Sequence, residues 1–180
     1  MPIFRTIAIA GLIAAMPAVA VAADVITVPI SSQAELPIYE AVGFDWSGFY
    51  AGVYGSAQNS ALWGTQYGLG ANAGVNAQFD FYLLGAEVAV QGLTDGLGDT
   101  TYGQLLGRAG LVVSDNVLLY TAGGYGIDLG TPDEQDALLG GGVELAVTDS
   151  VSVRAQYLHG FPLQGDNPKD QFSVGANFHF

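Results

Sequence analysis

The chain has 180 residues, the length of one domain, and half of them are apolar while only 12% are charged. A formal net charge of −13, with four Lys and Arg residues in all, excludes a nucleic-acid partner because few basic side chains are available to neutralise phosphates. The lack of cysteine excludes disulfides and thiolate metal sites.

The first residues, MPIFRTIAIAGLIAAMPAVAVAAD, have the layout of a cleaved secretory signal peptide. An arginine precedes an apolar run, small residues follow, and cleavage is expected after Ala22 or Ala23. An uncleaved membrane anchor is the alternative, but a glycine and a proline interrupt a run that is already short for a bilayer. We therefore assign residues 1–22 to the signal peptide. Residues 23–45, which lack a sustained period and contain two prolines, are assigned to an extended periplasmic leader.

From residue 46 onward, apolar and polar residues alternate in segments of strand length that are separated by turn residues. The connections alternate between tight turns and longer, more polar loops, which is typical of an up-and-down barrel of the outer membrane. Eight strands are predicted, at about residues 47–57, 67–79, 83–92, 101–113, 117–128, 137–147, 151–161 and 171–180, with tight turns at 80–82, 114–116 and 148–150.

The two faces of these strands differ in a way that distinguishes a membrane barrel from a soluble one. One face is apolar and holds no charged residue in any of the eight segments, while the other carries mostly Gly, Asn, Gln and Ser. A soluble lipocalin-type barrel would instead have an apolar interior and a charged exterior. The fold class is therefore predicted to be all-β: residues 46–180 form an eight-stranded antiparallel up-and-down transmembrane β-barrel. Its apolar face meets lipid, and closure satisfies every backbone group inside the membrane.

Aromatic residues gather at both ends of the predicted strands, as expected at the two membrane interfaces. The alternative is that they are ordinary core aromatics of a soluble β-sandwich. The predicted girdle consists of Trp46, Phe49 and Phe79 at the end with the tight turns, and of Trp63, Tyr67 and Phe161 at the other end.

The alternation directs four charged residues into the lumen: Glu87, Arg108, Glu144 and Arg154. If residues 148–150 form a three-residue turn, Glu144 lies directly opposite Arg154, close enough for the side chains to meet. A two-residue turn would make this a diagonal contact. Pairing is expected because an unpaired charge in such an interior is costly. The set is interpreted first as a structural network, and second as a gate that opens a narrow water path by re-pairing. Eight strands leave room only for side chains, so a wide pore is not expected.

Several stretches resemble known outer-membrane barrels. DWSGFYAGVYG (45–55) is similar to the first strand of small alphaproteobacterial outer-membrane barrel proteins. The segments GAEVAVQG, LLGRAGLVVSDNVLLYTAGG, GGGVELAVTDSVSVRAQY and FSVGANFHF resemble the transmembrane domain of OmpA and the barrels of opacity proteins. The resemblance covers about residues 44–180 and implies an interior salt-bridge network for the four inward charges, with Arg108 at a position where OmpA has Lys.

The resemblance also implies that the barrel-assembly machinery reads the last strand. A lipid-facing edge strand would carry the same pattern, and both can hold together. OmpA's peptidoglycan-binding domain has no counterpart in this sequence, so no tether to the cell wall is expected. The residues of the predicted assembly signal are Phe172, Val174, Ala176, Phe178 and Phe180.

Some eight-stranded outer-membrane barrels modify lipids, and His159 is the candidate base for such a reaction. It faces lipid by its parity, no serine lies two residues away on its strand, and Ser173 points inward. We therefore expect an interfacial histidine, no catalytic residue and no enzymatic activity. His179 lacks a His or Cys partner for a metal, and neither a metal nor a cofactor is predicted.

The longer connections are acidic and contain Lys169 as their single basic residue. Their carboxylates, Asp136 among them, are expected to keep the loops solvated. The alternative is that they share divalent cations with lipopolysaccharide phosphates.

The sequence thus predicts a monomeric integral protein of the Gram-negative outer membrane that supports envelope structure and conducts at most through a narrow or gated pore. Its expected partners are outer-membrane lipid, lipopolysaccharide and, during biogenesis, the barrel-assembly machinery. A small-solute porin is the alternative function, and a lipid-modifying enzyme is the second alternative.

Overall fold

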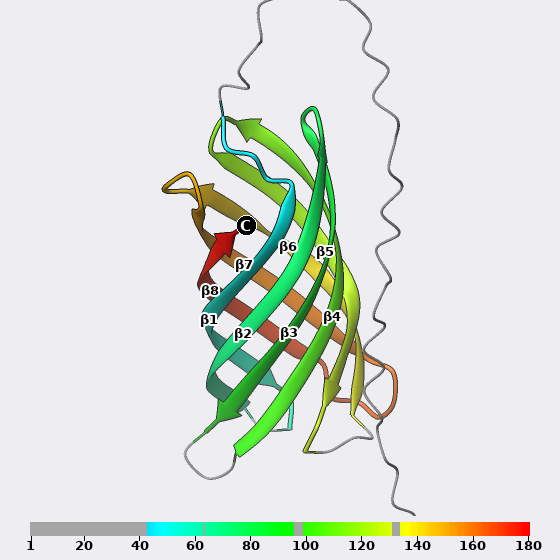
Figure 1. Ribbon diagram of the computed structural model, residues 1–180. Coiled ribbons are helices and arrows are strands. Elements are labelled where there is room, and N and C mark those ends of the chain that lie inside the picture. Colours follow the sequence, from blue (N-terminus) through cyan, green and yellow to red (C-terminus); the bar gives the residue numbers. More distant parts are fainter. Residues whose placement is uncertain (1–42, 63, 96–98, 131–133) are drawn as a thin grey trace, which may run out of the picture. The chain divides into compact units, whose positions relative to one another are not determined.

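The computed structural model describes residues 43–62, 64–95, 99–130 and 134–180 (Figure 1). The predicted signal peptide and residues 23–42 of the predicted leader lie outside the described residues. Within the described part of the chain, no helix is long and apolar enough to cross a bilayer.

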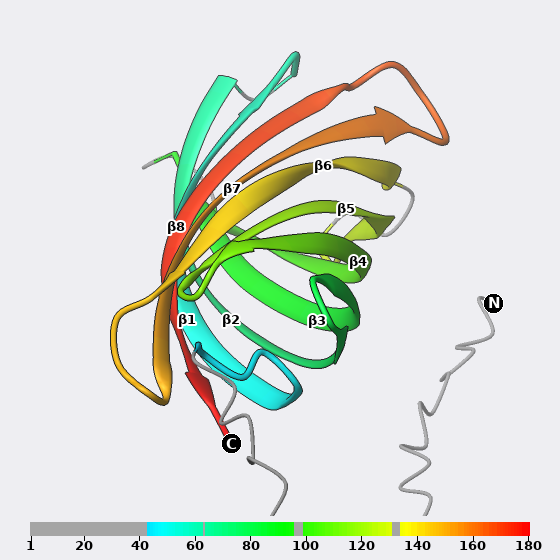
Figure 2. The ribbon, with the colours of Figure 1, turned by 90° about the horizontal axis from the view of Figure 1, so that it is seen from above.

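Eight antiparallel strands close into a barrel, in which each strand pairs with the next and β1 pairs with β8 (Figures 1 and 2). This topology confirms the predicted fold class. The strands are β1 Gly48–Ser60, β2 Gly64–Phe79, β3 Tyr82–Thr94, β4 Asp99–Ser114, β5 Val117–Asp128, β6 Gln135–Ala146, β7 Val151–Pro162 and β8 Lys169–His179.

The two ends of the barrel differ in their connections. Short turns at 80–81, 115–116 and 147–150 lie at one end together with the C-terminus, which we call the turn end (upper end in Figure 1). The longer connections lie at the opposite loop end. Strands extend further toward the loop end than the sequence pattern predicts: β1 continues to Ser60 and β8 begins at Lys169. The reason is that polar residues there continue the hydrogen-bonded ladder after the alternation of apolar residues has ended.

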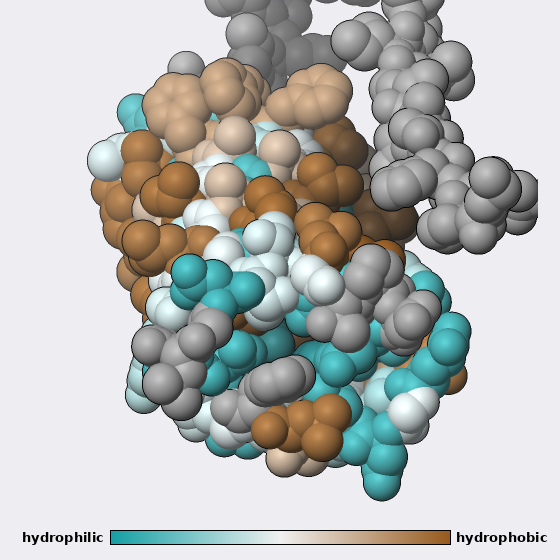
Figure 3. Space-filling view, turned by 90° about the horizontal axis from the view of Figure 1, so that it is seen from below, coloured by the Kyte–Doolittle hydropathy of each residue, from teal (hydrophilic) through white to brown (hydrophobic). Residues whose placement is uncertain are grey.

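Most side chains that point outward are apolar and exposed, whereas most that point inward are polar and buried. Figure 3 views the loop end and shows hydrophilic residues gathered around it, with hydrophobic residues on the adjoining wall. The exposed outward side chains include Val53, Leu69, Val88, Leu105, Leu119, Leu139, Val153, Phe172 and Val174.

Tyrosines of β1 lie across glycines of β2 inside the lumen. Tyr50 is the ladder partner of Gly74, and Tyr54 is the partner of Gly70. A Cβ added at either glycine would collide with the ring of its tyrosine. The absent side chains therefore let Tyr50 extend toward the centre of the barrel, where it meets the charged groups described below.

Candidate functional site

The structure brings the four inward charges of the sequence analysis together inside the lumen. Glu87, Arg108, Glu144 and Arg154 come from β3, β4, β6 and β7, and all four are buried. They are adjacent in space because period-two alternation directs each of them inward at a similar height. The layer contains two acids and two bases and has no formal net charge.

The two arginines bind different carboxylates. Arg154 binds Glu87 through both terminal nitrogens of its guanidinium, with Nη1–Oε2 and Nη2–Oε1 distances of 2.5 and 3.1 Å. Arg108 Nη2 lies 2.7 Å from Glu144 Oε2, and its Nη1 lies 3.6 Å from Glu87 Oε2. A two-pronged guanidinium–carboxylate contact fixes orientation as well as charge, so Arg154 is held firmly.

The pairing of Glu144 with Arg154 requires a correction. The register does place Glu144 directly opposite Arg154, as the three-residue turn predicts. The predicted side-chain contact is wrong, however, since Arg154 extends to Glu87 on β3. Both Glu144 oxygens are occupied by other groups: Oε2 accepts from Arg108, while Oε1 accepts from Ser152 Oγ at 2.5 Å and Asn177 Nδ2 at 2.7 Å.

Two tyrosines that the sequence analysis missed complete the charged layer. The phenol of Tyr50 donates to Glu87 Oε2 at 2.7 Å and accepts from Arg108 Nη1 at 2.6 Å, so it bridges the two ions. The guanidinium carbon of Arg108 lies 4.0 Å from the centre of the Tyr120 ring, a cation–π contact. The signal was present in the sequence, because the outward parity of Phe49 directs its neighbour Tyr50 inward.

The chemistry available to this layer is pairing and re-pairing of ions. Removing one partner of a buried pair leaves an uncompensated charge, which costs about 3–5 kcal/mol. Arg108 Nη1 lies 3.6 Å from Glu87 while Nη2 binds Glu144, so two carboxylates lie within reach of one guanidinium. The layer can therefore brace the barrel, and it also has the geometry of a switch.

A second charged cluster closes the lumen toward the loop end. Lys169 Nζ lies 2.8 Å from Asp136 Oδ2 and 3.1 Å from Glu134 Oε2, and Tyr102 donates to Asp136 at 2.5 Å. Asp136 and Lys169 are both buried, so the expectation that the Asp136 carboxylate only keeps a loop solvated is wrong. Both lie at the ends of strands that extend further than predicted. Between the two clusters, buried glutamines fill the lumen, with Gln171 accepting from Gln91 and Gln104.

At the turn end, residues 43–47 cross the mouth of the barrel before β1 begins, and we call this segment the strap. Trp46 of the strap is completely buried, against Leu83, Leu106 and Leu118. Its predicted place in the aromatic girdle is therefore wrong. The tryptophan precedes β1, and the chain turns at Gly48 so that its ring enters the lumen instead of facing outward.

The other predicted girdle residues lie on the outer wall, apart from Trp63, which lies outside the described residues. Phe49 and Phe79 are exposed near the turn end, and Tyr67 and Phe161 are exposed near the loop end. The residues of the predicted assembly signal share the outward face of the last strand, with Ala176 half-buried and Phe172, Val174, Phe178 and Phe180 exposed.

His159 lies on the outer wall near the loop end, in contact with two residues that the sequence analysis did not connect to it. Its Nδ1 lies 2.7 Å from Asp170 Oδ1, and the same oxygen accepts from Tyr157 at 2.5 Å. A carboxylate that orients a histidine is one part of a hydrolytic triad, but none of the described contacts of His159 is to a serine. In the described ranges, no group of three or more His, Cys, Asp or Glu residues is placed to hold a metal ion.

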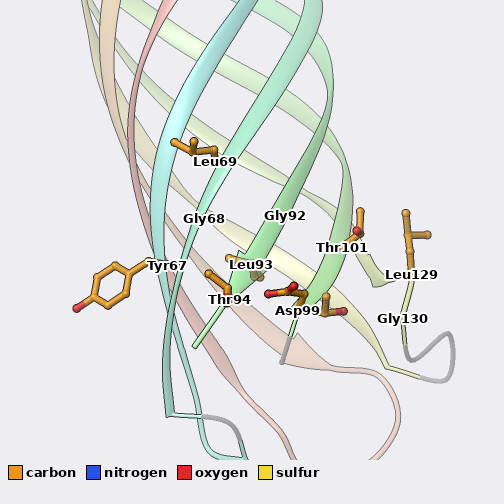
Figure 4. Close-up of a pocket in the computed structure, with 11 residues that line it drawn as sticks. Tyr67, Gly68, Leu69, Gly92, Leu93, Thr94, Asp99, Thr101, Leu129 and Gly130 are labelled. Carbon is orange, nitrogen blue, oxygen red and sulfur yellow. The ribbon is translucent and has the colours of Figure 1, made fainter. Parts of the chain in front are cut away.

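The outer wall also has a groove near the loop end, with a volume of about 970 Å³ (Figure 4). Gly92 on β3 lies between Leu69 on β2 and Thr101 on β4 in the ladder, and a Cβ added to it would meet no atom within 4 Å. Because Gly92 has no side chain, its backbone forms the floor of the groove. Its walls include Tyr67, Leu69, Thr94, Asp99, Thr101 and Leu129.

Comparison with known proteins gives similarity of fold. No family model and no curated protein sequence matches the chain. Ail of Yersinia pestis has a similar structure, with a TM-score of 0.56 and 14% identity over 74% of this chain and 97% of Ail. Neisserial surface protein A has a TM-score of 0.53 and 15% identity, and the match covers 74% of this chain and 98% of that protein. The N-terminal barrel domain of Pseudomonas aeruginosa OprF has a TM-score of 0.51 and 14% identity, and the match covers 73% of this chain and 99% of that domain. The chain therefore has the fold of the eight-stranded outer-membrane barrels.

Proposed function

We propose that this chain is an integral protein of the Gram-negative outer membrane, with the loop end toward the cell exterior and the turn end toward the periplasm. The largely apolar outer wall supports this proposal, because charged side chains such as Asp99 and Asp170 lie near its loop end and the apolar remainder is suited to lipid. Closure of the sheet supports it as well, because every strand has two hydrogen-bonded neighbours.

Its role is to support envelope structure, with at most a narrow or gated path through the lumen. The observation that carries this proposal is the occupation of the lumen by buried ions that are paired with one another. A porin for small solutes needs an open aqueous channel, whereas here glutamines and two charged clusters fill the interior. The gated path stays in the proposal because Arg108 has two carboxylates within reach.

We do not assign an enzymatic role. The His159–Asp170 pair is the feature closest to a catalytic group, and it lacks a nucleophile among its described contacts. The proposed partners are lipid and lipopolysaccharide around the wall and the assembly machinery during insertion, and the proposed state is a monomer. The groove at Gly92, with a volume of about 970 Å³, is the proposed position of one acyl chain of an outer-leaflet lipid.

The experiment that tests the role is planar-bilayer recording of the wild type and Arg154→Gln, combined with a measurement of thermal stability. A structural network predicts unchanged conductance and lower stability for the variant. A gate formed by this layer alone, with no second closure in series, predicts higher conductance. Large, permanent conductance of the wild type would contradict the proposal and favour the porin.

A further inference from the structure

The strap fills the turn end of the lumen although it belongs to no strand. Residues 43–47 run from the start of β1 to the turn between β4 and β5, where Phe44 N donates to Asp115 O at 2.8 Å (Figure 1). Since β1 and β5 are four strands apart in a closed sheet of eight, the strap spans the mouth from one wall to the opposite wall.

The strap places a hydrophobic layer across the path through the barrel. Trp46 is completely buried, and its ring centre lies 4.6 Å from that of Phe44. The Phe44 ring in turn lies 4.9 Å from the ring of His179, which stacks on Tyr50 at 5.6 Å. A hydrophobic constriction of this kind stops water and ions by excluding water from the path. It lies in series with the charged layer, because Tyr50 belongs to both.

Few polar interactions hold the strap in place. Besides the bond of Phe44 to Asp115, Trp46 N donates to Gln78 Oε1 at 3.2 Å and Gln78 N donates to Ser47 Oγ at 3.1 Å. The indole nitrogen Nε1 of Trp46 is buried and has no hydrogen-bond partner in the described ranges. An unsatisfied buried donor is costly, and it would regain a partner in water. None of these bonds belongs to a strand ladder, so withdrawal of the strap would leave the pairing of neighbouring strands intact.

The surroundings of the strap allow such a movement. Cavities of about 500 and 690 Å³ flank it on its two sides, both lined by residues of the strap and of the β4–β5 turn. Gly48, at the junction of strap and β1, has a φ of 112°, which side-chain-bearing residues rarely adopt. The seated strap thus depends on a glycine at the position where the chain turns into the lumen.

We propose that residues 43–47 are a removable plug, which closes the periplasmic mouth with Trp46 and withdraws when a path through the barrel opens. The proposal rests on the proposed function, because it requires a barrel that is otherwise narrow or gated. It implies that rearranging the charged layer alone does not produce conductance while the strap is seated.

The first test is planar-bilayer recording of the full chain with Trp46→Ala, alone and combined with Arg154→Gln. The plug predicts that Trp46→Ala raises the open probability and that the double variant raises it further, while Arg154→Gln alone stays at the wild-type level. Phe49→Ala is the matched control, because it removes an exposed aromatic three residues away at the same end and should leave the current unchanged.

A second variant keeps the tryptophan and changes the backbone. An added Cβ at Gly48 is disfavoured by its φ and lies 3.0 Å from the carbonyl oxygen of Phe180. Gly48→Ala should therefore raise the ratio of withdrawn to seated strap roughly tenfold. Gly165→Ala is its control, because Gly165 also has a positive φ, 76°, but lies in the β7–β8 connection and has no neighbour within 4 Å of an added Cβ.

A disulfide can lock the plug, because the chain has no cysteine of its own. A Cβ at Gly43 would lie 3.5 Å from that of Asp115, a separation within the range of disulfides. The pair Gly43→Cys and Asp115→Cys, added to Arg154→Gln and Gly48→Ala, should lose its current on oxidation and regain it on reduction.

Two results would overturn the plug. The first is that Trp46→Ala and Gly48→Ala fold, as judged by heat-modifiable migration, yet conduct no more current than the wild type. The charged layer and the Lys169 cluster would then close the barrel without the strap, and the proposed structural role would stand. If the wild type conducts permanently and the oxidised lock leaves that current intact, both the plug and the proposed function fail.

Discussion

Arg154 stands directly opposite Glu144 in the β6–β7 ladder, yet its guanidinium crosses the lumen to bind Glu87 on β3. Ladder hydrogen bonds join only neighbouring strands, whereas this ion pair joins two strands on opposite walls of the barrel. The bond from Arg108 to Glu144 likewise joins β4 to β6, which do not pair. The charged layer therefore acts as a set of cross-braces that fixes the cross-section of the barrel.

The cross-brace arrangement predicts which pairs of residues are energetically coupled. In double-mutant cycles with Glu87→Gln, Glu144→Gln and Arg154→Gln, we expect about 1–3 kcal/mol of coupling between Glu87 and Arg154. The coupling between Glu144 and Arg154 should be clearly smaller, although these two are the ladder partners. Urea unfolding of the refolded protein in lipid vesicles provides the free energies. A stronger coupling of Arg154 to Glu144 than to Glu87 would show that Arg154 pairs with its ladder partner and would contradict the cross-brace.

The bridging phenol of Tyr50 should contribute to stability through its hydroxyl group alone. Tyr50→Phe keeps the ring but removes the donor to Glu87 and the acceptor for Arg108, so we expect a loss of about 1–3 kcal/mol in the free energy of unfolding. Tyr67→Phe, which removes a hydroxyl from an exposed tyrosine, is the control and should change stability little. Equal effects of the two substitutions would argue against the bridge.

The cluster around Lys169 should behave as an independent unit. Lys169→Met leaves the buried carboxylate of Asp136 without its cation, so the variant should be less stable. Since the two charged clusters share no partner among the contacts described above, the effects of Lys169→Met and Glu87→Gln should add to within about 0.5 kcal/mol in the double variant. Strong non-additivity in the same unfolding assay would mean that the lumen is one coupled network.

The groove at Gly92 should retain lipid. Gly92→Leu should occupy the groove, and because an added Cβ there meets no atom within 4 Å, the barrel should fold normally. We expect fewer lipid molecules to remain bound to the variant in native mass spectrometry after mild detergent extraction. Gly107→Leu is a control on the outer wall away from the groove, where an added Cβ meets only the carbonyl oxygen of Gly123 at 3.7 Å. Equal lipid retention by wild type, Gly92→Leu and Gly107→Leu would show that the groove does not hold lipid.

Strand positions and the four inward charges could be predicted because a barrel strand has a side-chain period of two, which the sequence displays directly. The partner of Arg154 could not be, because it depends on the width of the lumen and on Ser152, Asn177 and Arg108 competing for Glu144. Trp46 was misplaced for a related reason. An aromatic residue just before the first strand has the same sequence pattern whether it faces lipid or folds back into the mouth.

The most direct test of the central claim, a closed barrel of the outer membrane, is fractionation of expressing cells followed by gel electrophoresis of heated and unheated samples. We predict that the protein sediments with the outer membrane and that the unheated sample migrates differently from the boiled one, because a closed barrel resists unfolding in detergent. A protein found in the soluble fraction, with identical migration before and after boiling, would contradict the account.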